Sequence, residues 1–138
     1  MEPELNEVAL KRLLLSRVFQ LRRNQFVYES LDKPQSVQDD MISVDGQQVK
    51  RRRVILTAHG CKVATCTMCP LPDEAVSPKT EVTLEHWINQ IKGAIGPDDD
   101  IHTLTLFHNG NYFNEREVPS AWRMVIHDYL RTQTRIKC

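Results

Sequence analysis

The chain lacks a long apolar run, and this absence bounds what it can be. None of its hydrophobic stretches is long enough to span a bilayer. The residues after Met1 contain no cationic region followed by an apolar stretch, so we expect no secretory signal peptide. We therefore expect no membrane partner and a cytoplasmic location, where thiols stay reduced and available to metal.

Net charge is also absent. The 138 residues include 18 Lys and Arg and 18 Asp and Glu, a formal charge of zero. This balance argues against a protein that binds nucleic acid mainly by bulk electrostatics. Residues 50–53 form a local basic run, and its simplest interpretation is a solvated segment that flanks a strand. The hydrophobic fraction of 41% suffices for the core of one modest domain.

The first 50 residues predict a lead-in made of a helix and a small hairpin. Residues 3–25 carry one apolar stripe at helical spacing, typical of a helix that packs against an end of a core: Leu10, Leu14, Val18 and Leu21. Residues 30–40 are polar and interrupted by Pro34, so we expect a loop there. Asp45-Gly46, between short apolar segments, predicts the turn of a hairpin.

Strand and helix patterns alternate from residue 51 onward. Residues 53–58 and 101–107 are short apolar runs, each followed by a glycine-bearing loop, as expected of buried strands. One helical pattern follows the N-cap candidate Thr83, another opens at Pro119, and residues 135–138 resemble the start of a third strand. This order predicts an α/β fold with a parallel sheet, in which residues 51–138 form the core and residues 1–50 precede it.

Three of the four cysteines lie within nine residues, directly after the first of these strands. They are Cys61, Cys66 and Cys69, and the fourth is Cys138. Such crowding resembles no ordinary disulfide framework and favours a metal or an iron–sulfur cluster. A closed zinc site requires four protein ligands, and a [4Fe–4S] cluster is usually held by four cysteines. A cluster held by only three would leave one iron free to bind a small molecule.

The spacing Cys61-x4-Cys66-x2-Cys69, after the first strand of a βα series, resembles the cluster loop of the radical S-adenosylmethionine (radical SAM) superfamily. The commonest form of that motif has three residues in the first gap, whereas this chain has four. The strings Gly60-Cys61…Cys66-Thr-Met-Cys69 and Phe107-His-Asn-Gly-Asn-Tyr-Phe-Asn-Glu-Arg-Glu-Val-Pro119 are similar to the branch that contains archaeosine-synthesis and elongator-like proteins. The resemblance covers roughly residues 53–138 and excludes the first helix.

The resemblance implies a cofactor chemistry and a set of site residues. The three cysteines would hold three irons of a [4Fe–4S] cluster, and the fourth iron would bind S-adenosylmethionine. Reductive cleavage of S-adenosylmethionine would give a 5′-deoxyadenosyl radical, with the electron coming from a separate donor. Met68 would lie near the adenine, and the loop of Asn109, Gly110 and Asn111 would accept from the ammonium of the methionine moiety. The Gly-Gly-Glu sequence that is usual in the family is absent from this loop.

Each of these site residues also has an alternative interpretation. Met68 is equally an ordinary packing methionine, and Gly110 equally a plain turn residue. A structural zinc-binding module is the main alternative, with His59, His108 or Cys138 as the fourth ligand. Strand-end histidines, however, are more often packed or solvated. Cys66-Thr-Met-Cys69 alone would also suit a thioredoxin-like thiol enzyme, although the third cysteine then has no role.

The resemblance also implies that the fold is incomplete. Barrels of this kind have about six βα units, and α/β barrels run to roughly 200 residues or more, whereas this chain provides about two units. We therefore expect a partial (β/α) barrel of the radical SAM type, either a truncated product or one part of a split protein that a second chain completes. Alone, such a chain would be poorly stable and not catalytic. The substrate, tRNA or another, is not specified by the sequence.

Overall fold

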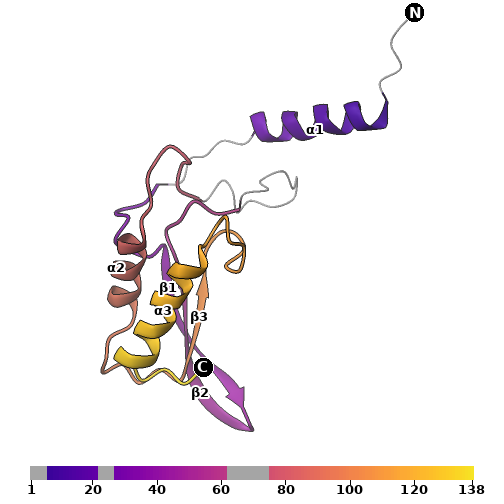
Figure 1. The fold of residues 1–138 in the computed structure, drawn as a ribbon. Coiled ribbons are helices and arrows are strands. Elements are labelled where there is room, and N and C mark those ends of the chain that lie inside the picture. The colour runs from indigo at the N-terminus through magenta and orange to yellow at the C-terminus, as the bar shows by residue number, and fades with distance from the viewer. Residues whose placement is uncertain (1–5, 22–26, 62–74) are drawn as a thin grey trace, which may run out of the picture.

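The computed structural model describes residues 6–21, 27–61 and 75–138 of the chain (Figure 1). Within these ranges the fold is mixed α/β, with three helices and one three-stranded sheet. The α/β prediction is therefore confirmed at this level. In chain order the elements are α1 (Glu7–Leu21), β1 (Ser36–Val44), β2 (Gln47–Ile55), α2 (Leu84–Ala94), β3 (Thr103–Phe107) and α3 (Ser120–Gln133).

The predicted hairpin is present and is longer than expected. β1 and β2 pair antiparallel around a turn at Asp45 (φ 50°) and Gly46 (φ 78°). Positive φ at both central residues is the geometry of a tight hairpin turn that follows the twist of the strands. The prediction of a loop across residues 30–40 is wrong for residues 36–40, which belong to β1. Their polar composition suits an edge strand with only part of its surface buried.

The basic run of residues 50–53 lies inside β2 rather than beside a strand, so its interpretation as a simple solvated flank is wrong. Arg51 donates to Asp40 through Nε (2.8 Å) and Nη2, and Arg52 donates to Asp39 through Nε (2.8 Å) and Nη2 (3.0 Å). These acidic partners stand on β1, directly across the hairpin. Cross-strand pairs of opposite charge therefore stabilise the register of two polar strands.

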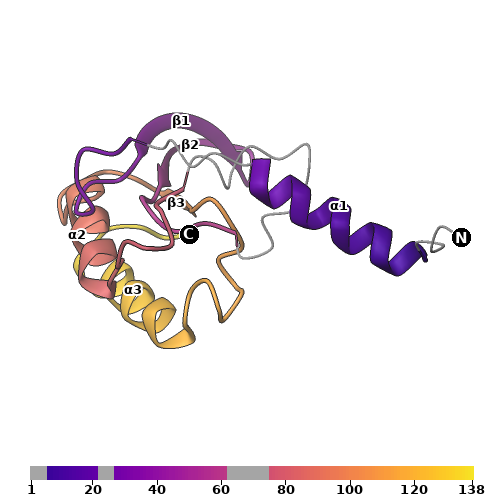
Figure 2. The same ribbon diagram turned by 90° about the horizontal axis from the view of Figure 1, so that it is seen from above.

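β2 and β3 pair parallel, as the alternation of strands and helices predicted. The hydrogen bonds continue beyond β2, where the Leu56 N–H donates to the Phe107 carbonyl at 2.8 Å. α2 and α3 lie on the same face of the sheet (Figures 1 and 2). The core forms between that face and the helices, and its most buried large residues are Val54, Leu56, Trp87, Ile91, Ile95, Ile101, Val118 and Ile126.

α2 begins and ends where the sequence predicts. The Thr83 hydroxyl accepts from the His86 N–H, and the His86 ring accepts from the Thr83 N–H, so the first turn is capped from both sides. Gln90 on this helix is fully buried and fixes the end of β2: its Oε1 accepts from the Thr57 N–H (2.8 Å), and its Nε2 donates to the Leu31 and Thr57 carbonyls. The helix thus holds the segment that leads to Cys61.

The last residues of the chain pair with the outer edge of β3. The Cys138 N–H donates to the His102 carbonyl (3.2 Å), and the Cys138 carbonyl accepts from the Leu104 N–H (2.9 Å). Two bonds that straddle Thr103 in this way are the repeat of a parallel ladder. Cys138 therefore pairs with β3 at the place predicted for a further strand, but residues 135–138 are not a strand and the described sheet has three strands.

The N-terminal helix does not pack as its leucine stripe predicted. α1 projects away from the sheet in Figure 1, and every side chain of residues 6–17 is exposed, including Leu10 (44%) and Leu14 (58%). Leu13 and Leu15 are exposed too, so apolar side chains surround the helix rather than forming one narrow seam. In the ranges that the structure describes, no helix has the length and apolar character needed to cross a membrane.

Candidate site at the carboxyl ends of the parallel strands

The loops that follow β2 and β3 are in contact. At Gly60 (φ 81°), an added Cβ would lie 2.7 Å from the Asn109 carbonyl oxygen and 2.8 Å from the Ala75 Cβ. At Gly110, an added Cβ would lie 2.9 Å from the Cys61 nitrogen. Both glycines are thus required by close backbone approach, and Gly60 by its left-handed conformation as well. The start of the cysteine loop and the loop of Asn109, Gly110 and Asn111 form one cluster at this edge of the sheet.

Glu117 holds the second loop in shape. Its Oε1 accepts from the Asn111 N–H (2.9 Å), and its Oε2 accepts from the Asn114 side-chain amide (2.8 Å). Glu117 Oε1 lies 2.0 Å from the position of a Cβ at Gly110, so it occupies the space that a side chain would need. No local sequence pattern indicates this role of Glu117, because one of its two bonds is to a backbone N–H and both depend on the conformation of the loop.

The structure describes Cys61 but not all of the predicted cluster loop. Cys61 is a half-buried free thiol beside Gly110, whereas Cys66, Met68 and Cys69 lie outside the described residues. In the described part, no three His, Cys, Asp or Glu side chains are grouped closely enough to hold a metal ion. The predicted ligand set therefore stays a prediction.

Cys138 lies at the other end of β3. It pairs beside Thr103, where the strand begins, whereas Cys61 adjoins the loop that follows Phe107. At about 3.3 Å per residue, β3 separates these two positions by roughly 13 Å. Cys138 is also exposed. Cys138 is therefore not placed to share a metal site with Cys61.

His59, one of the two strand-end histidines, serves the backbone. Its Nε2 donates to the Thr80 carbonyl, and next to it the Val76 N–H donates to the Ala58 carbonyl at 2.8 Å. These bonds fasten residues 75–80 beside the end of β2. The plainer interpretation of His59 as a packed histidine suits this geometry.

His108 differs, because neither ring nitrogen has a hydrogen-bond partner in the described part of the chain. The residue is only 7% exposed and packs against Trp87 with 5.8 Å between ring centroids. Burial lowers the pKa of His108 below its ordinary value and favours the neutral ring, and this effect exceeds the opposing influence of the Glu117 charge and of the nearby Asn111 backbone. A neutral imidazole is the form that binds metal. His108 also lies close to Cys61, since its Cε1 is 2.7 Å from the same Gly110 Cβ position.

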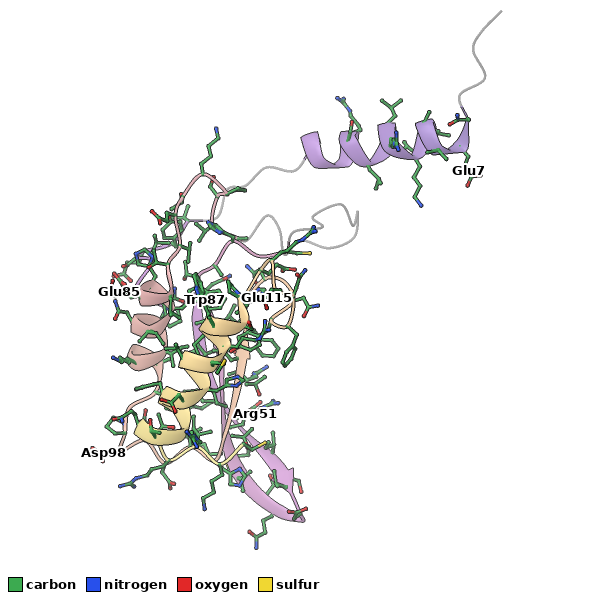
Figure 3. The ribbon with its side chains drawn as sticks, in the orientation of Figure 1. Glu7, Arg51, Glu85, Trp87, Asp98 and Glu115 are labelled. Atoms are coloured by element: carbon green, nitrogen blue, oxygen red, sulfur yellow. The ribbon has the colours of Figure 1, made fainter. Side chains whose placement is uncertain are left out.

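A cavity of about 170 Å³ lies directly behind the two loops, lined by Gly60, His108 and Glu117 on the loop side and by Trp87 and Trp122 on the helix side. The Trp87 Nε1 is buried and also lacks a partner among the described residues. Figure 3 shows Trp87 on the side of α2 that faces α3. Unpaired polar groups around a space of this size are ordinarily satisfied by water. The cavity thus lies beside Gly60, directly before Cys61.

No protein-family model, curated protein or solved structure matches this chain. The cysteine spacing and the geometry of the two loops are therefore the features that bear on its function.

Proposed function

We propose that this chain is the cluster-binding part of a radical SAM protein, with Cys61, Cys66 and Cys69 as ligands of a [4Fe–4S] cluster. One observation supports the proposal above the others. The loop that begins at Cys61 and the loop of Asn109 to Asn111 touch at the carboxyl ends of two adjacent parallel strands. Open α/β sheets and α/β barrels bind their ligands at this edge.

The loop residues have distinct roles in this proposal. When bound, the cluster supplies the electron that cleaves S-adenosylmethionine. The three thiolates would hold three irons and would leave the fourth without a protein ligand. Gly60 and Gly110 let the two backbones approach closely, and Glu117 fixes the loop whose carbonyls would accept from the methionine ammonium. Met68 would contact the adenine.

The open edge of β3 supports the proposal of an incomplete barrel. Beyond Leu104, the described residues provide no further strand on this side of β3. An apolar groove of about 360 Å³ runs beside it, lined by Leu104, Leu106, Tyr112, Leu130 and Ile136. We propose that further strands, which a second chain can supply, cover this groove and complete the barrel. An open edge next to an apolar groove is otherwise a site of aggregation.

Anaerobic reconstitution of the full chain tests the ligand set. Cys61→Ala, Cys66→Ala and Cys69→Ala should each abolish retention of iron and sulfide, because loss of one thiolate leaves two ligands. Cys138→Ala is the matched control and should retain both at the level of the unaltered chain. Loss of iron from the Cys138 variant, or full retention by any of the other three, would contradict the proposal.

Structural zinc is the second candidate, and the unpaired ring of His108 favours it. This neutral imidazole close to Cys61 would serve as the fourth ligand of a Cys3His site. His108→Phe separates the two candidates by metal analysis. The substitution should leave the iron content of the reconstituted protein unchanged under the radical SAM proposal, and should remove stoichiometric zinc under the alternative.

A further inference from the structure

The buried imidazole of His108 has no use in the arrangement described so far. The residue directly follows β3 and is only 7% exposed. Neither of its ring nitrogens forms a hydrogen bond with a residue that the structure describes. A buried polar group without a partner costs roughly 1 to 3 kcal/mol, so native proteins leave few of them. The ring therefore indicates a partner that the described residues do not supply.

The described neighbours of His108 are committed elsewhere or poorly placed. The Trp87 ring packs against it, but the Trp87 Nε1 is itself unpaired. Both Glu117 oxygens accept from the loop, from the Asn111 N–H and from the Asn114 amide. The Asn111 backbone is near the ring but makes no hydrogen bond with it.

The nitrogen-bearing edge of the ring lies toward the start of the cysteine loop. The His108 Cε1 is 2.7 Å from the position of a Cβ at Gly110, and the Cys61 nitrogen is 2.9 Å from the same point. Cε1 is bonded to both ring nitrogens, so the polar edge of the imidazole is the part of His108 nearest to that point. The neutral ring has one N–H donor and one acceptor nitrogen. A group held at Cys61 is therefore within the surroundings of an unused donor.

We propose that the His108 N–H donates a hydrogen bond to a sulfur of the [4Fe–4S] cluster and thereby raises the reduction potential of the cluster. The inference rests on the proposed function, because it requires a cluster at Cys61. Hydrogen bonds to the sulfurs are one of the means by which proteins set cluster potentials. The reduced cluster carries one more negative charge than the oxidised cluster, so a donor stabilises the reduced form more. Donation to a sulfur also leaves the fourth iron open.

Redox titration of the anaerobically reconstituted full chain, followed by electron paramagnetic resonance, tests the inference. His108→Phe should retain iron and sulfide but make reduction about tenfold less favourable, which is about 59 mV for one electron. His108→Gln keeps an N–H donor and should restore at least part of the lost potential. Trp122→Phe is the matched control, because it alters the helix side of the same cavity, and should leave the potential unchanged.

Pulsed electron paramagnetic resonance of protein labelled with ¹⁵N-histidine gives a second readout. The reduced cluster of the unaltered chain should show a weak coupling to nitrogen. The chain has five histidines, so the loss of this coupling in His108→Phe assigns it to His108. The spectra are recorded without S-adenosylmethionine.

Two sets of results would contradict the inference, and they differ in what they say of the cluster. A potential that His108→Phe leaves unchanged, or a reduced cluster without nitrogen coupling, would overturn the hydrogen bond alone and would mean that the ring bonds to water in the cavity. A strong coupling from a nitrogen bound directly to iron, or an unaltered chain that holds no cluster, would contradict the proposed function as well.

Discussion

Two glycines with nearly the same backbone conformation have opposite surroundings. Gly46 (φ 78°) turns the hairpin with no atom within 4 Å of an added Cβ, whereas Gly60 (φ 81°) would place that Cβ 2.7 Å from the Asn109 carbonyl oxygen. The left-handed conformation alone costs an L-residue roughly 1 to 2 kcal/mol. The pair therefore separates the cost of conformation from the cost of contact between the two loops.

Gly60→Ala should destabilise the protein more than Gly46→Ala does. We expect about 1 kcal/mol for Gly46→Ala, and about 2 kcal/mol more for Gly60→Ala because backbone atoms must move. Urea unfolding followed by circular dichroism measures both. Equal losses in the two variants would show that the loops after β2 and β3 are not in close contact.

His108 is a buried ring whose nitrogens have no hydrogen-bond partner among the described residues. His108→Phe should change the free energy of unfolding of the metal-free protein by less than about 1 kcal/mol, because the ring still packs on Trp87 and its nitrogens have no hydrogen-bond partner among the described residues. Thermal unfolding after treatment with a chelator measures the change. A clear loss of stability would mean that the imidazole has a partner within the protein.

Among the secondary-structure elements, Arg52 connects β2 to the end of α2 and to β1. Its Nη1 donates to the Ala94 carbonyl (2.8 Å) and to Asp99 Oδ2 (2.9 Å), while Nε donates to Asp39. The side chain is 16% exposed. One guanidinium therefore satisfies the last turn of a helix and two carboxylates, as planar, multidentate donors do.

Arg52→Met should lower the free energy of unfolding by about 1 to 3 kcal/mol, because a nearly buried carbonyl and two carboxylates lose their donor. Arg131→Met removes an arginine that is 79% exposed and whose ion pair among the described residues is with its helix neighbour Asp128, so it should have no measurable effect. Denaturant unfolding compares the two. A loss no larger than that of the Arg131 variant would contradict the bridging role.

The same substitution should change the response to acid. The hydrogen bond from Arg52 lowers the pKa of Asp39, and the Gly96 N–H followed by Arg52 lowers the pKa of Asp99, from an ordinary value of 3.8. Both carboxylates therefore stabilise the fold fully above pH 3.8, and this stability is lost as the pH falls through their lower folded values. Arg52→Met should weaken that loss without abolishing it, since Asp99 keeps its bond from Gly96.

Elements with strong local signals could be predicted from the sequence, and polar ones could not. α2 follows from its cap at Thr83, its apolar period and Gly96-Pro97, all local features. The polar part of β1 was missed because its stability comes from arginines on β2, which a local pattern does not contain. The packing of α1 was predicted wrongly, since a leucine stripe does not show that a partner surface exists.

For the molecule as a whole, parallel strands explain how much of the site could be predicted. Two strands in βα units must end at the same edge, so the meeting of Cys61 with the loop of Gly110 follows from the order of elements. The carboxylate of Glu117 over Gly110 could not be predicted in the same way. It depends on the conformation of a loop closed by side chain to backbone bonds.

The edge of the sheet beyond β3 is open. β3 receives only the last residues of the chain on its outer side, and an apolar groove adjoins it. A site at the carboxyl ends of an open sheet is accessible to water, and further strands would enclose it. In the proposed function, binding of the cluster and completion of the barrel would be separate events, and the first can be measured on this chain alone.

Electron paramagnetic resonance of the anaerobically reconstituted and reduced protein, recorded with and without S-adenosylmethionine, is the most direct measurement. With three cysteine ligands, one iron is open, so we predict a [4Fe–4S] signal whose shape changes when S-adenosylmethionine is added. A signal that S-adenosylmethionine leaves unchanged, or a colourless protein with stoichiometric zinc and no iron, would contradict the radical SAM proposal.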